Sequence, residues 1–513
     1  MDSNQICMLV TIIVYLLAMV AIGVYYSSKN KNVSDFYLGG RGLGPFVSAM
    51  SAEASDMSSW LLMGLPGVAY LTGGAEAGWT AIGLAIGTYL NWLIVAKRLR
   101  IYTEKCNNAI TIPDFFSNRY RDNKKIILGI AALIILVFFV PYTASGFAAC
   151  GKLFSSLFGW NYHIAMIVSA IIIILYTCTG GFLAASTTDL IQSIVMTLAL
   201  VILVVFGVHT AGGFENVVDN AKSLSGYFSL TNIHNVETGG SDKYSLLTIA
   251  SLLAWGLGYF GMPHILLRFM AIKDKKQIKT SRRIASVWVV ISMAIAIFIG
   301  FIGNALTANG KVEALSGNDS ETIVIKMATI LSENGIIFAC IAGLIFAGIL
   351  ACTMSTSDSQ LLAASSSMSE NIFKGVFKMK LSAKASMLVA RAVLVVIAVL
   401  GVIIAWNPDS SVFRIVSFAW AGFGATFGPL MLTALFWKRS NKWGAMAGLL
   451  VGGIMVFVWK FCISKLGGVW AIYELLPAFV CALVAIIVVS LLTGKPEKEI
   501  VDEFDAVNAE MKA

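Results

Sequence analysis

Residues 53–67, EASDMSSWLLMGLPG, decide how the fold is interpreted. They place two carboxylates, three serines and a Gly-Leu-Pro-Gly break in a stretch that otherwise has the composition of a membrane span. Glycine and proline interrupt helical hydrogen bonding, and the hydrocarbon of a bilayer offers the freed backbone groups no partner. The stretch therefore predicts a broken membrane helix at 45–73, whose polar groups are satisfied by neighbouring side chains or by a bound solute.

The composition of the whole chain fits a polytopic membrane protein. Hydrophobic residues make up 58% and charged residues 13% of the 513 positions, against about 45–50% and about 25% in soluble domains. Apolar runs long enough to cross a hydrocarbon core of about 30 Å recur along the chain. We expect one all-α transmembrane domain, 1–513, with thirteen spans: 6–26, 45–73, 78–97, 126–155, 160–179, 186–212, 245–267, 284–308, 323–372, 387–405, 411–437, 443–464 and 469–493.

The basic residues predict the orientation of these spans. They concentrate in the loops that follow odd-numbered spans, beginning with Lys29, Lys31 and Arg41 and continuing at 97–125, 273–283, 374–384 and 438–442. The positive-inside rule then places the N-terminus outside and the tail 494–513 in the cytoplasm of a multi-pass cell-membrane protein. Because the positive-inside rule explains the basic residues, the net charge of +9 does not indicate a nucleic-acid partner. We expect the acidic tail to be solvated or frayed, and the long segment 213–243 to be a solvated or partly ordered connector.

A second break lies in the seventh span, in WGLGYFGMP at 255–263. Five spans separate the two breaks, and an odd number of helices reverses topology. The segments 45–212 and 245–437 are therefore predicted to be inverted repeats, each opening with a broken helix, as in transporters that bind solutes at such breaks. The alternative is a pair of ordinary helices kinked by glycine and proline.

Oxygen ligands for a cation are available at the first break and on the ninth span. Carbonyls of Ala54 and Met57 could point at a cation, and the N–H groups of Ser58 to Trp60 at a carboxylate. On the ninth span, Cys352, Ser355, Thr356 and Ser359 share one helix face. Such a neutral oxygen cage suits Na⁺. Alternatively, the hydroxyls bond back to carbonyls of their own helix or join helices together.

Ionisable residues at membrane depth are costly and usually functional. The four carboxylates in this position are Glu53, Asp56, Asp189 and Asp358. Asp56 has the alternative role of an N-cap for the second half-helix. Arg268 and His264 follow the second break, where we expect the arginine to snorkel toward the cytoplasmic surface at little cost.

Aromatic residues flank the breaks. Trp255 and Tyr259 are one helical turn apart, Pro263 follows one turn later, and Tyr142 neighbours Pro141 in the fourth span. They could enclose a small apolar ring, although core packing is the commoner use of such a stripe. The chain has no P-loop and only four histidines, which argues against an ATP-driven pump or a metalloenzyme and favours a secondary transporter.

Five segments taken together resemble the sodium:solute symporter family, and in particular its proline-transporting members. They are FYLGGRGLGPFVSAMSAEASDMSSWLLMGLPG (36–67), GGFLAASTTDLIQ (180–192), WGLGYFGMPHILLRFMA (255–271), MSTSDSQLL (354–362) and LFWKRSNKWGAMAGLLVG (435–452). The resemblance covers nearly the whole chain. It implies a thirteen-helix fold with a five-plus-five inverted-repeat core, spans 2–6 and 7–11, with broken helices 2 and 7.

The resemblance also implies roles for individual residues. Its Na⁺ site corresponds to the carbonyls of Ala54, Met57 and Cys352 and the hydroxyls of Ser355 and Thr356. Its coupling residues correspond to Asp56 and Arg41. Its substrate pocket corresponds to Ser58, Ser59, Trp60, Tyr142, Trp255, Tyr259 and Pro263. A second cation site in some members corresponds to Asp189, Ser355, Asp358 and Ser359.

Four residues depart from the pattern of the proline-transporting members. Glu53 and Ser59 stand where glycine is usual, Cys352 where alanine is usual, and Asp358 where serine is usual. The carboxylate of Asp358 makes a second Na⁺ or a proton plausible. Glu53 has no assigned role.

The predicted function is uptake of a small solute, in the first place L-proline, driven by inward Na⁺ movement through alternating access. The alternatives are a Na⁺-coupled symporter of another small amino acid or a monocarboxylate, and, in a different class, a passive channel or a membrane sensor.

Overall fold

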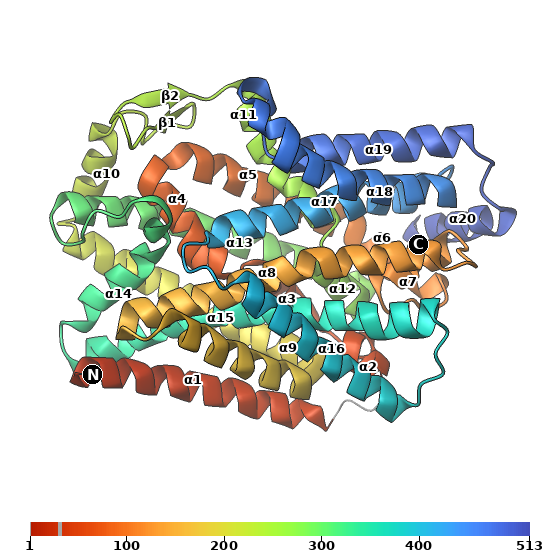
Figure 1. Cartoon of the computed structure of the whole chain (residues 1–513), viewed down its shortest axis with the longest axis horizontal. Helices are drawn as coiled ribbons and strands as arrows, with labels where there is room; N and C mark the ends of the chain where they lie inside the picture. Colours follow the sequence, from red (N-terminus) through yellow and green to blue (C-terminus); the bar gives the residue numbers. More distant parts are fainter. Residues whose placement is uncertain (1, 29–32, 513) are drawn as a thin grey trace.

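In the computed structural model the chain is a bundle of long helices that lie side by side (Figure 1). The structure describes residues 2–28 and 33–512, so Lys29 and Lys31 of the predicted orientation signal lie outside the described residues. The N-terminus lies at one end of the bundle, with α10, α14 and the β-hairpin, and α7 and α20 lie at the other end. We call these the N-terminal and C-terminal ends.

The helices run, in chain order, as α1 (Ser3–Ser27), α2 (Val33–Leu38), η1 (Gly39–Arg41), α3 (Pro45–Asp56), η2 (Trp60–Gly64), α4 (Leu65–Thr72), α5 (Gly74–Leu90), η3 (Asn91–Val95), α6 (Ala96–Lys105), α7 (Ile112–Arg119), α8 (Ile126–Phe158), α9 (Tyr162–Thr210) and α10 (Phe214–Ser223). After the hairpin β1 (Asn232–His234) and β2 (Ser241–Lys243) follow α11 (Leu246–Leu253), η4 (Ala254–Phe260), α12 (Pro263–Ala271), η5 (Lys275–Gln277), α13 (Ile278–Ala308), η6 (Gly317–Thr322), α14 (Ile323–Ser332), α15 (Ile336–Ser366), η7 (Ser367–Val376), α16 (Ala383–Ile404), α17 (Val412–Phe436), α18 (Lys442–Val458), η8 (Trp459–Ile463), η9 (Ser464–Leu466), η10 (Gly468–Trp470), α19 (Leu475–Leu492) and α20 (Lys498–Lys512).

Ten helices in the described part of the chain are long and apolar enough to cross a membrane, or eleven when one bent pair counts as a single span. The all-α membrane fold is thus confirmed. Two shorter apolar segments, Trp60–Thr72 and Tyr162–Cys178, correspond to parts of further predicted spans. The second of them belongs to α9, which is kinked at Gly181. The full count of thirteen stays a prediction.

Both predicted breaks are present. In the first, α3 ends at Asp56, Met57 leaves the helical conformation with φ −74° and ψ 68°, and the chain resumes as the π-helical η2. In the second, the 3₁₀ segment η4 ends at Phe260 and α12 begins at Pro263, with an angle of 45° between the halves. Proline is tolerated there because a first-turn residue needs no intrahelical N–H bond.

The two broken helices pack reciprocally. The halves of the first, α3 and α4, lie against α13, whereas the halves of the second, η4 and α12, lie against α5 and α6. Glycines allow these approaches, since a Cβ at Gly83 would lie 2.5 Å from the carbonyl oxygen of Leu253, and one at Gly300 would lie 2.5 Å from that of Pro66. Each broken helix thus contacts the helix that follows the other break. This exchange supports inverted repeats at 45–212 and 245–437, which stay a prediction.

One predicted span and one predicted loop contain secondary structure beyond what the sequence indicated. The predicted span 323–372 is divided into α14 and α15 by a turn at Gly335, whose φ of +115° is accessible to glycine. The segment 213–243 contains α10 and the β-hairpin, and the hydroxyl of the buried Tyr227 donates to the Tyr70 carbonyl oxygen at 2.9 Å. Of the two expectations for this segment, the partly ordered connector therefore describes it and the fully solvated one does not.

The expectation of a solvated or frayed tail is wrong, because α20 is docked on the C-terminal end of the bundle. Ile500, Phe504 and Val507 are buried, and the guanidinium of Arg98 lies 4.9 Å from the Phe504 ring centroid. Glu510 pairs with two lysines, Lys105 at 3.0 Å and Lys275 at 2.6 Å, and Glu503 pairs with Arg121 at 2.7 Å. The apolar residues at i, i+4 and i+7 in the tail were the available sequence signal for this helix.

We predict that Phe504→Ala releases the tail. Removal of a buried phenylalanine ring costs about 3–5 kcal/mol in a core, and about half of that at this peripheral contact. Trypsin cleavage after Lys498 of the full-length protein should therefore accelerate about tenfold, because exposure of the site tracks local opening. The matched control is Phe377→Ala, since the Phe377 side chain is 64% exposed. Equal cleavage rates in the two variants would contradict docking of α20 through Phe504.

Candidate functional site

The two breaks are joined by a direct hydrogen bond. The Tyr259 hydroxyl in η4 donates to Oδ2 of Asp56, the last residue of α3, at 2.5 Å. The amide of Asn91 in turn donates to the Tyr259 carbonyl oxygen at 2.9 Å. Within the described chain, Oδ1 of Asp56 is buried without a hydrogen-bond partner. The Asp56 carboxylate thus bonds to Tyr259, and no side-chain cap is found at the start of η2.

The predicted Na⁺ ligands lie where α15 crosses the end of α3. The Ser355 hydroxyl donates to the Ala54 carbonyl oxygen at 2.7 Å and lies 3.2 Å from that of Cys352. Met57 and Thr356 are also buried. Oγ1 of Thr356 has no hydrogen-bond partner among the described residues. A buried hydroxyl without a partner is costly, which marks this position as a place for a ligand.

Bonding back along the helix does not explain these hydroxyls. Thr353, one turn earlier, shows that alternative, because its hydroxyl donates to the Ile349 carbonyl oxygen at 3.0 Å. Ser355 instead makes its shorter bond across to α3, and Thr356 makes none that the described residues provide. The stripe on α15 therefore joins two elements.

The N–H groups at the first break are already partly used. The Ser58 N–H donates to the Asp56 carbonyl oxygen at 2.8 Å, and the Trp60 N–H donates to the Ser58 hydroxyl at 3.4 Å. The Trp60 indole N–H also donates to the Asp56 carbonyl at 3.1 Å, and the Tyr142 hydroxyl approaches the same oxygen at 3.5 Å. Oγ of Ser59 is buried without a partner in the described chain. A carboxylate bound here would have to displace the Ser58 hydroxyl.

The two predicted aromatic residues of η4, Trp255 and Tyr259, point in different directions. Trp255 stacks on Tyr473 with ring centroids 4.9 Å apart, whereas Tyr259 meets Trp420 edge to face at 5.1 Å. Close backbone packing holds η4 in place, because a Cβ at Gly261 would collide with the Phe423 carbonyl. Trp255 thus faces away from the break, and Tyr259 faces Asp56.

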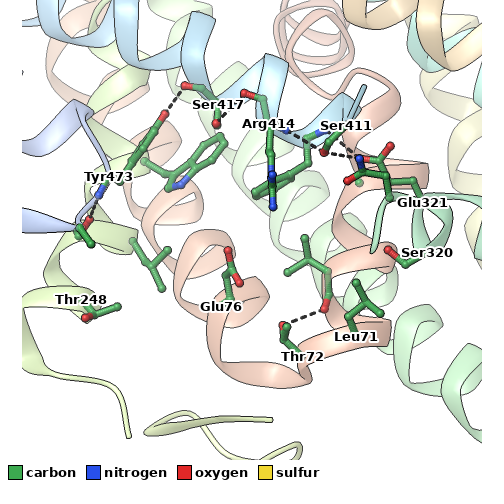
Figure 2. Close-up of a pocket in the computed structure, with 18 of the residues that line it drawn as sticks. Leu71, Thr72, Glu76, Thr248, Ser320, Glu321, Ser411, Arg414, Ser417 and Tyr473 are labelled. Atoms are coloured by element: carbon green, nitrogen blue, oxygen red, sulfur yellow. Dashed lines mark hydrogen bonds between the residues drawn. The ribbon is translucent and has the colours of Figure 1, made fainter. Parts of the chain in front are cut away.

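A cavity of about 460 Å³ lies beside this segment, lined by residues of α4, α5, η4, η6 and α17 (Figure 2). Of the seven predicted substrate residues, Trp255 is part of its lining. The other six are buried and, in the described structure, lie outside that lining: Ser58, Ser59, Trp60, Tyr142, Tyr259 and Pro263. The structure therefore separates the predicted pocket at the breaks from an open cavity that reaches Trp255.

Arg268 is at the centre of the predicted second cation site. Its guanidinium lies 3.2 Å from Oδ2 of Asp189 and also contacts the hydroxyl of Ser359. Ser359 donates to Oδ1 of Asp358 at 3.0 Å. Arg268 is only 1% exposed, so the expectation that it snorkels to the surface is wrong. Its pairing with Asp189 in α9 compensates for its burial.

The charge of this cluster is not balanced by Arg268 alone. Two carboxylates, Asp189 and Asp358, face one guanidinium, and one oxygen of each carboxylate has no hydrogen-bond partner in the described chain. The hydroxyl of Ser51 supports Asp189 at 2.6 Å. Ser355, predicted for this site too, turns its hydroxyl to Ala54. With both carboxylates ionised, the cluster has one negative charge more than Arg268 neutralises.

Glu53, which had no assigned role, is held by the helix after the first break. It accepts hydrogen bonds from the Trp92 indole N–H at 2.9 Å and from the Thr88 hydroxyl at 3.2 Å. Thr88 and Trp92 were missed in the sequence. Their signal is a polar residue and an indole one turn apart in the largely apolar helix formed by α5 and η3.

Hydrogen bonds of Arg41 connect the segment before α3 to the end of α12. Its guanidinium donates to the carbonyl oxygens of Met270 at 2.6 Å and Ala109 at 2.9 Å, and to the Thr103 hydroxyl at 3.2 Å. Burial, with Arg100 nearby, lowers the pKa of Arg41 to about 10, which leaves it charged at neutral pH. The second predicted coupling residue thus links three segments at the C-terminal end of the bundle.

Comparison with known proteins gives a consistent set of relatives. The model of the sodium:solute symporter family matches residues 36–452. A sodium/proline symporter of Haemophilus influenzae is 44% identical over 504 residues, which cover 97% of each chain. A sodium/proline symporter of Escherichia coli is 42% identical, covering 98% of this chain and 96% of its own. A high-affinity proline transporter of Bacillus subtilis is 41% identical, covering 95% and 98%.

A solved structure has the same fold. The substrate-bound, outward-open state of a Na⁺-coupled sialic acid symporter superimposes with a TM-score of 0.79 and 20% sequence identity. The match covers 96% of this chain and 99% of the other. At this level of identity the likeness concerns the fold alone.

Proposed function

The chain belongs to the sodium:solute symporter family, and from this premise we propose that it couples inward Na⁺ movement to uptake of L-proline across the cell membrane. As a member of a family of symporters it is a transporter and not an enzyme. The choice of proline rests on relatives that are 41–44% identical over nearly their full length and are named for proline transport.

The observation that carries the proposal is the buried Thr356 hydroxyl without a partner, next to the Ser355 hydroxyl that reaches the Ala54 carbonyl. We place Na⁺ between the end of α3 and α15. Its ligands are the carbonyls of Ala54, Met57 and Cys352 and the hydroxyls of Ser355 and Thr356. Five oxygens of this kind form a hard, neutral cage. Ser355 must turn its proton away from Ala54 so that its oxygen faces the ion.

The substrate binds beside this ion, at the two breaks. Its carboxylate lies toward the first turn of η2, where the Ser59 hydroxyl lacks a partner, and its ring lies against aromatic residues of α8 and η4. The residues of the pocket are Ser58, Ser59, Trp60, Tyr142, Tyr259 and Pro263, whereas Trp255, predicted for the same pocket, lines the separate cavity beside η4. The bond from Tyr259 to Asp56 joins the ion side to the substrate side. Asp56 therefore couples the two sites, and Arg41 couples the motion of α12 to the C-terminal end.

A second cation completes the cluster around Arg268. Asp189 and Asp358 carry one negative charge more than Arg268 neutralises, and each has an oxygen without a partner in the described chain. A second Na⁺ or a proton, held there with Ser355 and Ser359, supplies the missing charge. Desolvated carboxylates otherwise cost several kcal/mol.

The proposed orientation places the N-terminus outside and α20 in the cytoplasm. Arg98, Arg121 and Lys275 all lie near α20, as the positive-inside rule requires of the cytoplasmic end. Alternating access then exposes the breaks to either side. One Na⁺ gains about 2.3 kcal/mol per 100 mV and about 1.4 kcal/mol per tenfold gradient, which together support about a few-hundred-fold accumulation.

Uptake into proteoliposomes tests the proposal. The purified chain should accumulate proline when a Na⁺ gradient is imposed, and should do so in preference to other small amino acids and monocarboxylates. Proline should also bind more tightly in sodium than in choline buffer, and Na⁺ more tightly with proline, by the same factor. Equal proline affinity in the two buffers contradicts Na⁺ coupling. Flux without saturable counterflow indicates the channel alternative.

A further inference from the structure

A groove of about 610 Å³ lies on the surface of the bundle, between α3, α9 and α13. One stripe of α13 forms its longest wall, because Arg283, Val287 and Ile291 follow one another at four-residue intervals. Val287 is 59% and Ile291 is 51% exposed, in a helix that is apolar enough to cross a membrane. The groove therefore opens toward the hydrocarbon of the bilayer.

Most of the polar side chains in the groove already have partners. The Trp288 indole N–H donates to the Thr197 hydroxyl at 2.9 Å, which joins α13 to α9. The hydroxyls of Ser193 and Thr197 donate to carbonyl oxygens of their own helix, each at 2.7 Å. The rest of the lining is apolar except for Ser292 and Arg283. An acyl chain therefore fits the length of the groove better than a polar ligand does.

One end of the groove is basic. Arg283 is exposed there, and within the described chain its guanidinium has no hydrogen bond or ion pair. Lys279 precedes it by one helical turn on the same face and is likewise exposed. Arg282, by contrast, lies over the Tyr89 ring, 5.4 Å from its centroid. Among the described residues of the lining none is acidic. An anionic group at this end thus meets two cations that have bonding capacity left.

The length of the groove matches one leaflet of a bilayer. Arg283 and Ile295 line it and are 12 positions apart, which is about 18 Å along a helix, and half of a hydrocarbon core is about 15 Å thick. The basic end lies at the C-terminal end of the bundle, because Lys275, just before α13, pairs with Glu510 of α20 (Figure 1). A phospholipid of the leaflet at that end therefore brings its phosphate to Arg283 when its chain runs along the groove.

We propose that this groove is a binding site for an anionic phospholipid. The phosphate binds Arg283 and Lys279, and one acyl chain lies along α13 between Phe46 of α3 and Ile194 of α9, which both line the groove. Basic sites between membrane helices are suited to acidic lipid headgroups. The ammonium of a choline headgroup, in contrast, finds no carboxylate among the described residues of the lining. The site should therefore favour a headgroup with a net negative charge.

The site touches the first broken helix. Met50 lines the groove and lies one turn before Ala54, whose carbonyl is a proposed Na⁺ ligand. Ser193 lines the wall formed by α9, one turn after Asp189. A lipid seated here packs against both helices, so its binding should stabilise the arrangement of α3 and α9 seen in this structure. The lipid site itself does not depend on the proposed function.

Native mass spectrometry of the purified full-length protein tests the headgroup. Phosphatidylglycerol and phosphatidylcholine with identical acyl chains are titrated separately, and the Kd of the first bound lipid is measured. Phosphatidylglycerol should bind at least about fivefold more tightly. Lys279→Gln and Arg283→Gln should each weaken its binding about fivefold, which is the usual contribution of one basic residue near an anionic lipid surface. The matched control is Lys384→Gln in the first turn of α16, an exposed lysine outside the lining, whose Kd should stay within about twofold of wild type.

A second pair of variants tests the acyl chain. Val287→Trp fills the groove, whereas Val290→Trp adds the same side chain to α13 outside the lining, at a position that is 52% exposed. Both valines face away from the core, so both variants should fold. Val287→Trp should weaken both lipids at least about fivefold, and Val290→Trp should change neither by more than about twofold. The same Kd in the two variants would contradict a chain seated in the groove.

Three further results overturn the proposal. Equal affinity of the wild type for the two lipids contradicts selection of an anionic headgroup. Equal losses in Arg283→Gln and Lys384→Gln contradict a site at Arg283. A homodimer without bound lipid, which Val287→Trp dissociates, makes this face an interface between two copies of the chain. Neither proline nor Na⁺ enters these measurements, so failure of the lipid site is distinguishable from failure of the proposed function.

Discussion

Thr356→Ala should raise the Na⁺ concentration for half-maximal proline uptake about 10- to 100-fold. The variant removes one of five proposed ligands, and a hydrogen-bonding group that contacts a charge is worth about 1.5–3 kcal/mol, where each 1.4 kcal/mol is tenfold in affinity. The Thr356 hydroxyl is buried and has no partner in the described chain. Its removal therefore breaks no hydrogen bond of the ion-free protein. The measurement is the Na⁺ dependence of initial uptake rate in proteoliposomes.

Two variants on the same helix serve as controls. Thr356→Ser keeps the hydroxyl and should remain within about threefold of wild type. Thr353→Ala removes a hydroxyl that bonds to the Ile349 carbonyl of its own helix, so its Na⁺ dependence should not change. A comparable shift in Thr353→Ala and Thr356→Ala would mean that loss of helix polarity, and not loss of a ligand, causes the effect.

The breaks could be predicted from the sequence because their causes are local. At the second break, Gly261 and Pro263 flank the interruption, whereas at the first the chain leaves the helix at Met57, before Gly64 and Pro66, which lie in helical backbone. Hydroxyl positions on α15 could be predicted too, because a helix face follows from spacing alone. The hydrogen bond from Ser355 to the Ala54 carbonyl, however, depends on packing between segments about 300 positions apart in the chain. Residue spacing along one helix cannot predict it.

Pairing between distant segments accounts for what was missed. Arg268 was expected at the surface because its helix end lies near the loop, but Asp189 in α9 draws it inward. Glu53 had no role because its partners, Thr88 and Trp92, lie on the next helix. The tail was predicted to be solvated because of its charge, but the ring of Phe504 packs against Arg98 and Tyr102 on α6. Each case depends on a contact that only the folded chain defines.

Coupling between ion and substrate has a short physical route in this fold. The proposed ion site includes the carbonyls of Ala54 and Met57, on either side of Asp56, and Asp56 is bonded to Tyr259 in η4. An ion that orders the end of α3 therefore also fixes the position of η4, which carries Tyr259 and Trp255. Reciprocity then requires the substrate to order the ion site in return. Trp255 of the same segment also lines the cavity beside η4.

Arg268→Gln should destabilise the folded protein more than any other substitution considered. Arg268 is buried and pairs with Asp189 at 3.2 Å, near Asp358. Its removal leaves two buried carboxylates without their cation, and breaking a buried pair in this way costs about 3–5 kcal/mol. We expect the apparent melting temperature in detergent, followed by loss of the monodisperse peak after heating, to fall by at least about 5 °C.

Asp358→Asn supplies the matched comparison, because it removes one carboxylate and leaves the pair of Arg268 with Asp189 intact. It should be neutral or stabilising, since the cluster then carries equal numbers of opposite charges. The double variant Arg268→Gln/Asp358→Asn should recover part of the loss, because only Asp189 is left unpaired. If Arg268→Gln and Asp358→Asn lower the melting temperature equally, the cluster is not short of positive charge. The reasoning for a second cation at Asp189 and Asp358 then fails with it, while the Na⁺ site at Thr356 is unaffected.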